Sequence, residues 1–243
     1  MSYNLTYKPF GERAILIEWP NKIEDDILHD ILGFKEKLFK LLIKELLYVN
    51  HAYNSLIVFY KNKIPDFEAK KSTINKIYID KNDDVSLSVI KWVIPVCYDD
   101  IFGLDLTELS IEKDLSKAEV IQLHSEAVYK IYFIGFLPGF LYLGGLNEKL
   151  FTPRKATPRL RVEKGAVAIG GNQTGVYPVA SPGGWNVIGN SPVSFFNLNN
   201  DKPCFAQPGD FIKFKPVSLK EYNDIKILCE AGVYELESEV IHG

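Results

Sequence analysis

Residues 135–192 hold eleven of the seventeen glycines and six of the thirteen prolines of this 243-residue chain. Glycine permits positive φ angles and close approach of the main chain to a ligand, and proline fixes φ, so this segment is expected to form shaped turns. Short apolar runs at 167–169, 175–177 and 185–188 separate those turns. Short β-prone runs between Gly/Pro turns are typical of a β-barrel or a β-sandwich.

The first third of the chain has a different pattern and predicts a separate α+β domain. Its strands and helices alternate as βαββα, and the first helix is expected to use Asn21 as its N-cap, with Glu24 three residues later. The polar run 80–84 is the candidate boundary, which gives a small α+β domain at 1–85 and a mainly β domain with short helices at 86–243. The predicted elements of the first domain are strands 14–18, 46–50 and 55–60 and helices 21–40 and 65–78.

Helix and strand signals also flank the Gly/Pro-rich segment. Asp105 with Glu108, Ser116 with Glu119, and Ser218 with Glu221 have the spacing of capping boxes and predict three short helices. Pro95 interrupts an apolar run, which suits an edge strand or a bulge. The predicted strands are 89–97, 127–134 and 211–215.

Composition excludes several classes of protein. Hydrophobic residues make up 47% and charged residues 24%, as in soluble globular proteins, and the net charge is −3. This balance gives no general reason to bind nucleic acid or an anionic membrane, and the acidic segment 105–126 argues against a DNA-binding helix-turn-helix. Without an apolar leader or a membrane-length apolar run, a cytoplasmic location is expected.

The metal-binding residue types are scattered. Cys97, Cys204 and Cys229 form no C-x-x-C pair, and the four histidines show no ligand spacing. We therefore expect no disulfide framework and no protein-built metal site.

Arginine is concentrated in one place. Residues 135–192 contain six basic and two acidic side chains and so carry +4, which leaves −7 for the remainder of a chain of net charge −3. Three of the four arginines, Arg154, Arg159 and Arg161, lie within eight positions, whereas lysine is spread along the chain. Because the arginine fork matches carboxylate and phosphate oxygens, the cluster predicts a local anion site. The alternative is a solvated basic loop with one structural ion pair.

No complete catalytic set can be identified. The chain has no P-loop motif and no G-x-S-x-G motif, and residues 135–192 contain no His, Cys or Asp. Polar groups at Gln173, Ser181 and Tyr177 could orient a substrate, and the backbone N–H groups of Gly183 and Gly184 could hold an oxyanion. The catalytic residues therefore stay unassigned, and the groups that transfer protons are expected to come from elsewhere.

Four runs carry a family resemblance. They are 132–146 (YFIGFLPGFLYLGGL), 152–159 (TPRKATPR), 165–178 (GAVAIGGNQTGVYP) and 181–189 (SPGGWNVIG). Together they resemble the family of 5-oxoprolinase B subunits, also labelled PxpB, KipI-like or allophanate hydrolase subunit 1, of the carboxyltransferase subdomain C and D type. The resemblance spans nearly the whole chain, with departures at His51 and Lys164 that do not touch the arginines.

The resemblance implies a cyclophilin-like β-barrel in the second domain and a subunit of an ATP-dependent 5-oxoprolinase. Such an enzyme opens the lactam of 5-oxo-L-proline to L-glutamate and works with subunits A and C, so ATP would be shared with those partners. The anion contacts expected on this basis are Arg154 and Arg159, with Arg161 in second place, and Gln173, Ser181, Gly183 and Gly184 would shape the site. A second group, Pro138, Gly139, Phe140, Tyr142 and Trp185, would form either the pocket or a surface for a partner subunit.

Two other functions fit the same resemblance. The KipI branch of the family resembles an inhibitor of a sporulation histidine kinase, a role that needs only a protein-binding surface. A subunit of a urea-carboxylase-like or allophanate-type amide hydrolase is the other possibility. Without partner subunits the chain is expected to be inactive.

Overall fold

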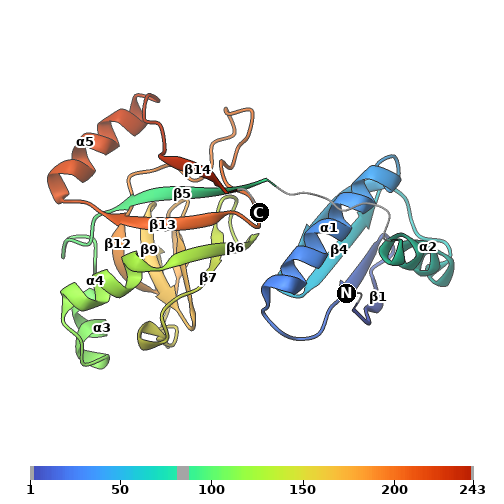
Figure 1. Ribbon diagram of the computed structural model, residues 1–243, viewed down its shortest axis with the longest axis horizontal. Helices are drawn as coiled ribbons and strands as arrows, with labels where there is room; N and C mark the ends of the chain where they lie inside the picture. The colour runs from blue at the N-terminus through green and yellow to red at the C-terminus, as the bar shows by residue number, and fades with distance from the viewer. Residues whose placement is uncertain (1–2, 81–87, 242–243) are drawn as a thin grey trace. The chain divides into compact units, whose positions relative to one another are not determined.

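The computed structural model describes residues 3–80 and 88–241, and the chain divides into two compact units, Met1–Leu87 and Ser88–Gly243 (Figure 1). The predicted domain boundary at residue 85, with most of the polar run that suggested it, lies outside the described residues.

The first unit is an antiparallel four-stranded sheet with two helices. The strand order is β1-β2-β4-β3, and apolar side chains of both helices join those of the sheet in one core. From the first helix, Ile27, Ile31 and Phe34 are buried in that core, and they have the spacing of one helix face. The elements are β1 (Thr6–Phe10), β2 (Ala14–Glu18), α1 (Asp25–Leu42), β3 (Leu46–His51), β4 (Ser55–Tyr60) and α2 (Phe67–Ile79).

The predicted N-cap of the first helix is wrong. Helix α1 begins at Asp25, and the Glu24 side chain at its N-cap position makes no capping hydrogen bond. Asn21 lies outside the helix, and its side-chain oxygen accepts a hydrogen bond from Asn54 Nδ2 (3.4 Å) in a distant loop. In α2 the cap is Asp66, whose carboxylate accepts from the Ala69 N–H (3.0 Å), so the helix begins two residues after Pro65.

The second unit is built on an eight-stranded mixed sheet. The strand order is β12-β9-β10-β7-β6-β13-β5-β14, and the β5–β13 pair is parallel whereas the other pairs are antiparallel. A two-stranded ribbon, β11-β8, lies apart from this ladder. The strands are β5 (Val89–Val96), β6 (Val128–Ile134), β7 (Leu141–Gly144), β8 (Arg159–Val162), β9 (Ala166–Gly170), β10 (Gln173–Val176), β11 (Ser181–Gly183), β12 (Asn186–Asn190), β13 (Phe211–Pro216) and β14 (Ser238–Ile241).

The expected closed barrel is replaced by a curled, open sheet. Among the described strands the ladder ends at β12 and β14, and β14 occupies the outer edge of β5 over Val89–Trp92. Just after β5 the chain forms one isolated β-bridge with β12, in which Cys97 and Asn190 exchange two backbone hydrogen bonds of 2.9 Å. The mixed α and β composition predicted for the chain is confirmed. In place of a continuous ladder that would close a barrel, the structure has that one bridge. Pro95 lies beyond the part of β5 that pairs with β14, where its missing N–H costs no bond on that edge.

Two of the three predicted capping boxes in this unit are confirmed. Ser116 with Glu119 opens α4 (Lys117–Glu126), and Ser218 with Glu221 opens α5 (Leu219–Glu230). The box predicted at Asp105 and Glu108 is wrong, because Asp105 precedes α3 (Leu106–Glu112) without a side-chain cap bond. Its carboxylate instead binds groups of Lys155, Arg159 and Val187, far away in the sequence, as described below. A short 3-10 helix, η1 (Glu148–Leu150), completes the helical elements of the unit's described part.

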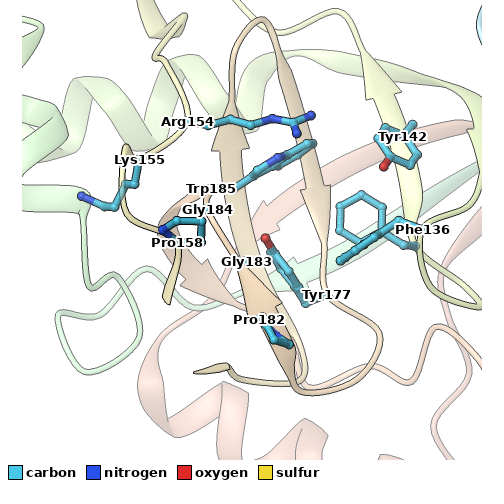
Figure 2. A pocket seen from close by; sticks show the side chains of 11 residues that line it. Phe136, Tyr142, Arg154, Lys155, Pro158, Tyr177, Pro182, Gly183, Gly184 and Trp185 are labelled. Atoms are coloured by element: carbon cyan, nitrogen blue, oxygen red, sulfur yellow. The ribbon is translucent and has the colours of Figure 1, made fainter. Parts of the chain in front are cut away.

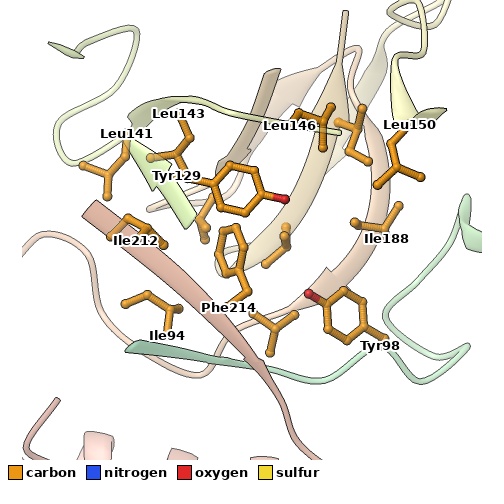
Figure 3. Packing of buried hydrophobic residues seen from close by; sticks show 14 of the residues in the cluster. Ile94, Tyr98, Tyr129, Leu141, Leu143, Leu146, Leu150, Ile188, Ile212 and Phe214 are labelled. Atoms are coloured by element: carbon orange, nitrogen blue, oxygen red, sulfur yellow. The ribbon is translucent and has the colours of Figure 1, made fainter. Parts of the chain in front are cut away.

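The core of the second unit lies inside the curl of the sheet, with side chains from strands and helices filling it (Figure 3). Tyr129 and Phe214 pack against each other with ring centroids 5.3 Å apart. A polar chain crosses this apolar interior: the Tyr98 hydroxyl contacts His124 Nδ1 (2.8 Å), and His124 Nε2 contacts Thr174 Oγ1 (2.8 Å). His124 is fully buried, and burial lowers its pKa to about 3, so the imidazole is neutral at neutral pH.

Candidate functional site

The Gly/Pro-rich segment forms a pocket of about 290 Å³ (Figure 2). Its walls come from the turn between β6 and β7, the segment that leads into β8, and the segment that joins β11 to β12. Most lining side chains are aromatic or proline, and two lining residues are cationic. The lining residues are Phe136, Phe140, Tyr142, Arg154, Lys155, Pro158, Tyr177, Pro182, Gly183, Gly184 and Trp185.

The β6–β7 turn places an aromatic ring at the edge of this pocket. The turn is closed by hydrogen bonds from the Gly135 N–H to the Phe140 carbonyl oxygen (3.2 Å) and from the Phe140 N–H to the Leu137 carbonyl oxygen (3.0 Å). Phe136 has a φ of +64° and is 62% exposed. Because bulky residues rarely adopt positive φ, the turn holds this ring in place at a conformational cost.

Three buried aromatic rings form the pocket floor. Phe140 meets Tyr177 and Trp185 edge-to-face, with ring centroids 5.4 and 5.5 Å apart. All three are buried, in a small cluster separate from the main core of the unit. Edge-to-face packing fixes the orientation of each ring, so the floor is rigid and apolar.

Two glycines make room for these rings. A Cβ atom on Gly170 would lie 2.7 Å from three atoms of the Trp185 indole, and one on Gly183 would lie 2.3 Å from the Tyr177 hydroxyl oxygen. Neither ring could move aside without disturbing the floor. Glycine is therefore required at both positions by close approach, whatever its backbone freedom.

Arg154 presents a positive charge that no acidic side chain of the described residues neutralises. Its Cζ lies 5.6 Å from the centroid of the Trp185 ring. Figure 2 shows the two side chains next to each other, and the described residues give the guanidinium no hydrogen bond or ion pair. The backbone around it is anchored on both sides. Thr152 pairs with Gly171 through two backbone hydrogen bonds of 3.0 and 2.7 Å, and the Lys155 N–H donates to the Gly184 carbonyl oxygen (2.7 Å). The cation is thus held over an aromatic face on a fixed segment.

The neighbouring cations are balanced by a buried carboxylate, Asp105, and an exposed one, Glu108. Asp105, 2% exposed, accepts two hydrogen bonds from the Arg159 guanidinium (2.8 and 2.7 Å) and lies 2.9 Å from Lys155 Nζ. It also accepts from the Val187 N–H (2.7 Å). Lys155 contacts Glu108 as well (2.8 Å). The sequence prediction of three anion-binding arginines thus corresponds to one unpaired arginine and one buried ion pair at the pocket.

Ionisation in and beside the pocket follows from these contacts. Burial disfavours the charged form of Asp105, but hydrogen bonds from Arg159, Lys155 and Val187 outweigh it, so the pKa of this carboxyl is lowered. Burial raises the pKa of Tyr142 and of Tyr177, although Arg154 lowers both to a smaller extent. Both phenols are therefore protonated at neutral pH and can donate hydrogen bonds.

The structure brings together some of the predicted site residues. Arg154, Gly183 and Gly184 of the predicted anion group line the pocket, as do Phe140, Tyr142 and Trp185 of the predicted pocket or partner loop. The other members of the two groups are outside its lining: Arg159, Arg161, Gln173, Ser181, Pro138 and Gly139. Arg161 pairs with Glu163 at the surface (2.6 Å).

Sequence reasoning did not assign Lys155 and Pro158 to the pocket, although both lie in the run that holds Arg154 and Arg159. Their position in that run was the available signal. Among the eleven lining residues, all within the described chain, there is no Asp, Glu, His or Cys. The pocket can therefore bind and orient an anion but has no carboxylate, imidazole or thiol to act as a general base.

Two further kinds of site are absent from residues 3–80 and 88–241. These residues form no cluster of three or more His, Cys, Asp or Glu side chains able to hold a metal ion. Within the same residues, every helix is too short or too polar to span a membrane.

A family model and several relatives match this chain over half of its length or more. The family model described as carboxyltransferase domain, subdomain C and D, matches residues 5–206. The 5-oxoprolinase B subunit of Bacillus subtilis is 33% identical over 240 residues, which cover 93% of this chain and 98% of that protein. The protein of the same name from Escherichia coli O157:H7 is 50% identical over 123 residues, or 51% of this chain and 56% of its own length.

A solved structure shares the fold. The urea amidolyase of K. lactis superposes on 99% of this chain and 16% of its own, with a TM-score of 0.82 and 18% sequence identity. At that identity the likeness concerns the fold alone. The family match over most of the chain and the nearly full-length relative show that this chain belongs to the family of 5-oxoprolinase B subunits, among the carboxyltransferase subdomain C and D proteins.

Proposed function

We propose that this chain is one subunit of an ATP-dependent 5-oxoprolinase, which opens the lactam of 5-oxo-L-proline to L-glutamate together with subunits A and C. Two relatives, one aligned over nearly its full length, are named as B subunits of 5-oxoprolinase. The structural observation that carries the proposal is the unpaired Arg154 guanidinium in an otherwise aromatic pocket. In the same proposal, the curled sheet of the second unit is a cyclophilin-like fold, and the Cys97–Asn190 bridge joins the segment after β5 to β12.

The pocket suits the substrate by charge and by shape. 5-Oxo-L-proline is a small ring with one carboxylate, and the pocket offers one unpaired guanidinium above a floor of aromatic rings. A hydrogen bond between charged groups in such a site contributes about 1.5–3 kcal/mol. Tyr142 lines the same pocket, and burial raises the pKa of its phenol, so it adds no negative charge beside the substrate.

ATP does not fit the same pocket. A triphosphate needs several cations and a Mg²⁺ ion held by oxygen ligands, whereas Lys155 is already paired and the lining contains no carboxylate. The nucleotide, and the groups that activate water, are therefore assigned to the partner subunits. This chain binds the substrate anion, orients the ring and excludes water from it.

The test is substrate dependence in the reconstituted complex of the three subunits. We expect Arg154→Gln to raise the KM for 5-oxo-L-proline at least tenfold, with a smaller change in kcat, because the variant removes the charge that binds the carboxylate. Lys149→Gln is the matched control, since Lys149 is an exposed cation of the same Gly/Pro-rich segment and lies outside the pocket lining.

An unchanged KM in an assembled Arg154→Gln complex would contradict the proposed substrate site. Turnover that needs only the other two subunits would contradict the proposed function and would favour the inhibitor alternative, which requires a protein-binding surface and no substrate pocket.

A further inference from the structure

We infer that Asp105 sets the specificity of the pocket by masking two of its three nearby cations, so that the site accepts a ligand with one carboxylate and rejects one with two. The inference rests on the proposed role of the Arg154 pocket as the substrate site. It assigns a determinant of specificity to a buried residue that does not itself line the pocket.

The charges around the pocket wall nearly balance. Arg154, Lys155 and Arg159 lie within six positions of the chain. Asp105 contacts Lys155 (2.9 Å) and forms a two-bond pair with Arg159 (2.8 and 2.7 Å). Glu108 supplies a second carboxylate to Lys155 (2.8 Å). The two acids thus balance the two cations, and Arg154 supplies the net positive charge of the wall.

Lys155 and Arg159, the two cations paired with Asp105, affect the electrostatic potential of the same pocket as Arg154. Lys155 lines the pocket directly. Burial raises the pKa of the Tyr177 phenol, which is part of the pocket floor, and Arg154 and Arg159 both lower it to a smaller extent. Charges that both influence one buried phenol also influence an anion bound beside it. Without Asp105, Glu108 would remain the carboxylate beside Lys155. A ligand would therefore meet a net charge of +2 from the three cations and this one acid.

The masking carboxylate is held in place by the main chain. Asp105 is buried, and its main chain and side chain both bind Val187, two residues after Trp185. Its backbone N–H donates to the Val187 carbonyl oxygen (2.8 Å), and its carboxylate accepts from the Val187 N–H (2.7 Å). The carboxylate cannot turn away from the cations without breaking these bonds, so the charge of the site is fixed.

The experiment compares two ligands on the full chain. Binding of 5-oxo-L-proline, with one carboxylate, and of glutarate, with two, is measured by calorimetry for the wild type and for Asp105→Asn. The wild type is expected to prefer 5-oxo-L-proline. In Asp105→Asn the ratio of the two affinities is expected to shift toward glutarate by about tenfold, because the amide keeps the shape but adds one unbalanced positive charge to the wall.

Three further variants make the result specific. Asp105→Asn combined with Arg159→Gln removes one of the two cations that Asp105 contacts and is expected to return the ratio toward the wild-type value. Glu108→Gln changes an exposed side chain and is expected to shift the ratio in the same direction by a smaller factor; it tests the inference even where Asp105→Asn fails to fold. Glu68→Gln, at an exposed ion pair with Lys71 in the first unit, is the control and is expected to leave the ratio unchanged.

The outcomes separate the two proposals. If the wild type binds 5-oxo-L-proline but neither Asp105→Asn nor Glu108→Gln alters the ratio, this inference is overturned and Asp105 serves only to hold the fold. If the wild type binds neither ligand, both the substrate site and this inference are overturned.

Discussion

Asp105 and His124 are both buried in the second unit, yet Asp105 keeps its charge whereas His124 is held neutral. Asp105 lies beside the pocket wall and meets two cations and a backbone N–H. His124 lies in the apolar core, where its two ring nitrogens contact the hydroxyls of Tyr98 and Thr174. At these two positions the fold thus keeps a buried charge where cations balance it, and uses neutral hydrogen-bonded side chains where the surroundings are apolar.

The largest effect is expected from breaking the charged cluster. Asp105→Ala leaves Lys155 and Arg159 without their shared buried carboxylate and also frees the Val187 N–H. Removal of one partner from a buried ion pair costs about 3–5 kcal/mol. Urea unfolding should show that the free energy of unfolding of the second unit falls by that amount. A loss below about 1 kcal/mol would mean that solvent already screens the pair.

The polar chain of Tyr98, His124 and Thr174 should lose its contribution to stability as pH falls. The pKa of His124 falls from 6.5 to about 3 on folding, so the unfolded chain takes up the proton first as pH decreases. Its stabilising contribution is therefore complete above pH 6.5 and is lost between pH 6.5 and pH 3, by at most about 1.4 kcal/mol per pH unit. The pKa of Asp105 is lowered from 3.8 on folding, so its contribution to stability is lost only as pH falls through 3.8 toward the lower pKa of the folded protein.

The two contributions can be separated by measuring the free energy of unfolding between pH 7 and pH 4.5 for the wild type and for His124→Gln, which does not titrate in that range. The slope should be shallower in the variant. Equal slopes would show that His124 does not determine acid sensitivity in this range.

The smallest effect is expected at the surface ion pair of Arg161 and Glu163, which includes neither Asp105 nor His124. Arg161 and Glu163 are 69% and 64% exposed and contact each other at the surface (2.6 Å). Exposed pairs of this kind are screened by water and salt. Glu163→Gln should leave the thermal midpoint of unfolding unchanged within error, and a clear decrease would show that the pair supports the adjacent ribbon strand β8.

Local sequence signals predicted most of the elements. The boxes at Ser116 and Ser218 involve side chains three residues apart, so the sequence carries all the information that they need. Asp105 has the same spacing to Glu108, but its carboxylate is drawn to Arg159, 54 residues later in the chain. A contact over that separation depends on the tertiary fold, which is why the local prediction failed there.

The position of the candidate site could be predicted from the sequence, but the positive charge available to a ligand could not. The Gly/Pro-rich segment located the pocket, and Arg154, Trp185 and the two glycines after Pro182 are in its wall as expected. The sequence could not indicate that Arg159 is paired, because its partner lies outside the basic segment. The count of arginines therefore overstated the positive charge available to a ligand.

The contacts between Asp105 and Val187 also occupy one open edge of the sheet. Strand β12 ends the eight-stranded ladder, and exposed edge strands invite other chains to add a strand. Here the Val187 N–H and carbonyl oxygen are both taken by Asp105, and those of Asn190 are both taken by Cys97. The sheet is open in its strand order, but this edge offers no pair of free main-chain groups at either position. The residue that pairs with the cations beside the pocket thus also occupies main-chain groups that a strand added to β12 would need.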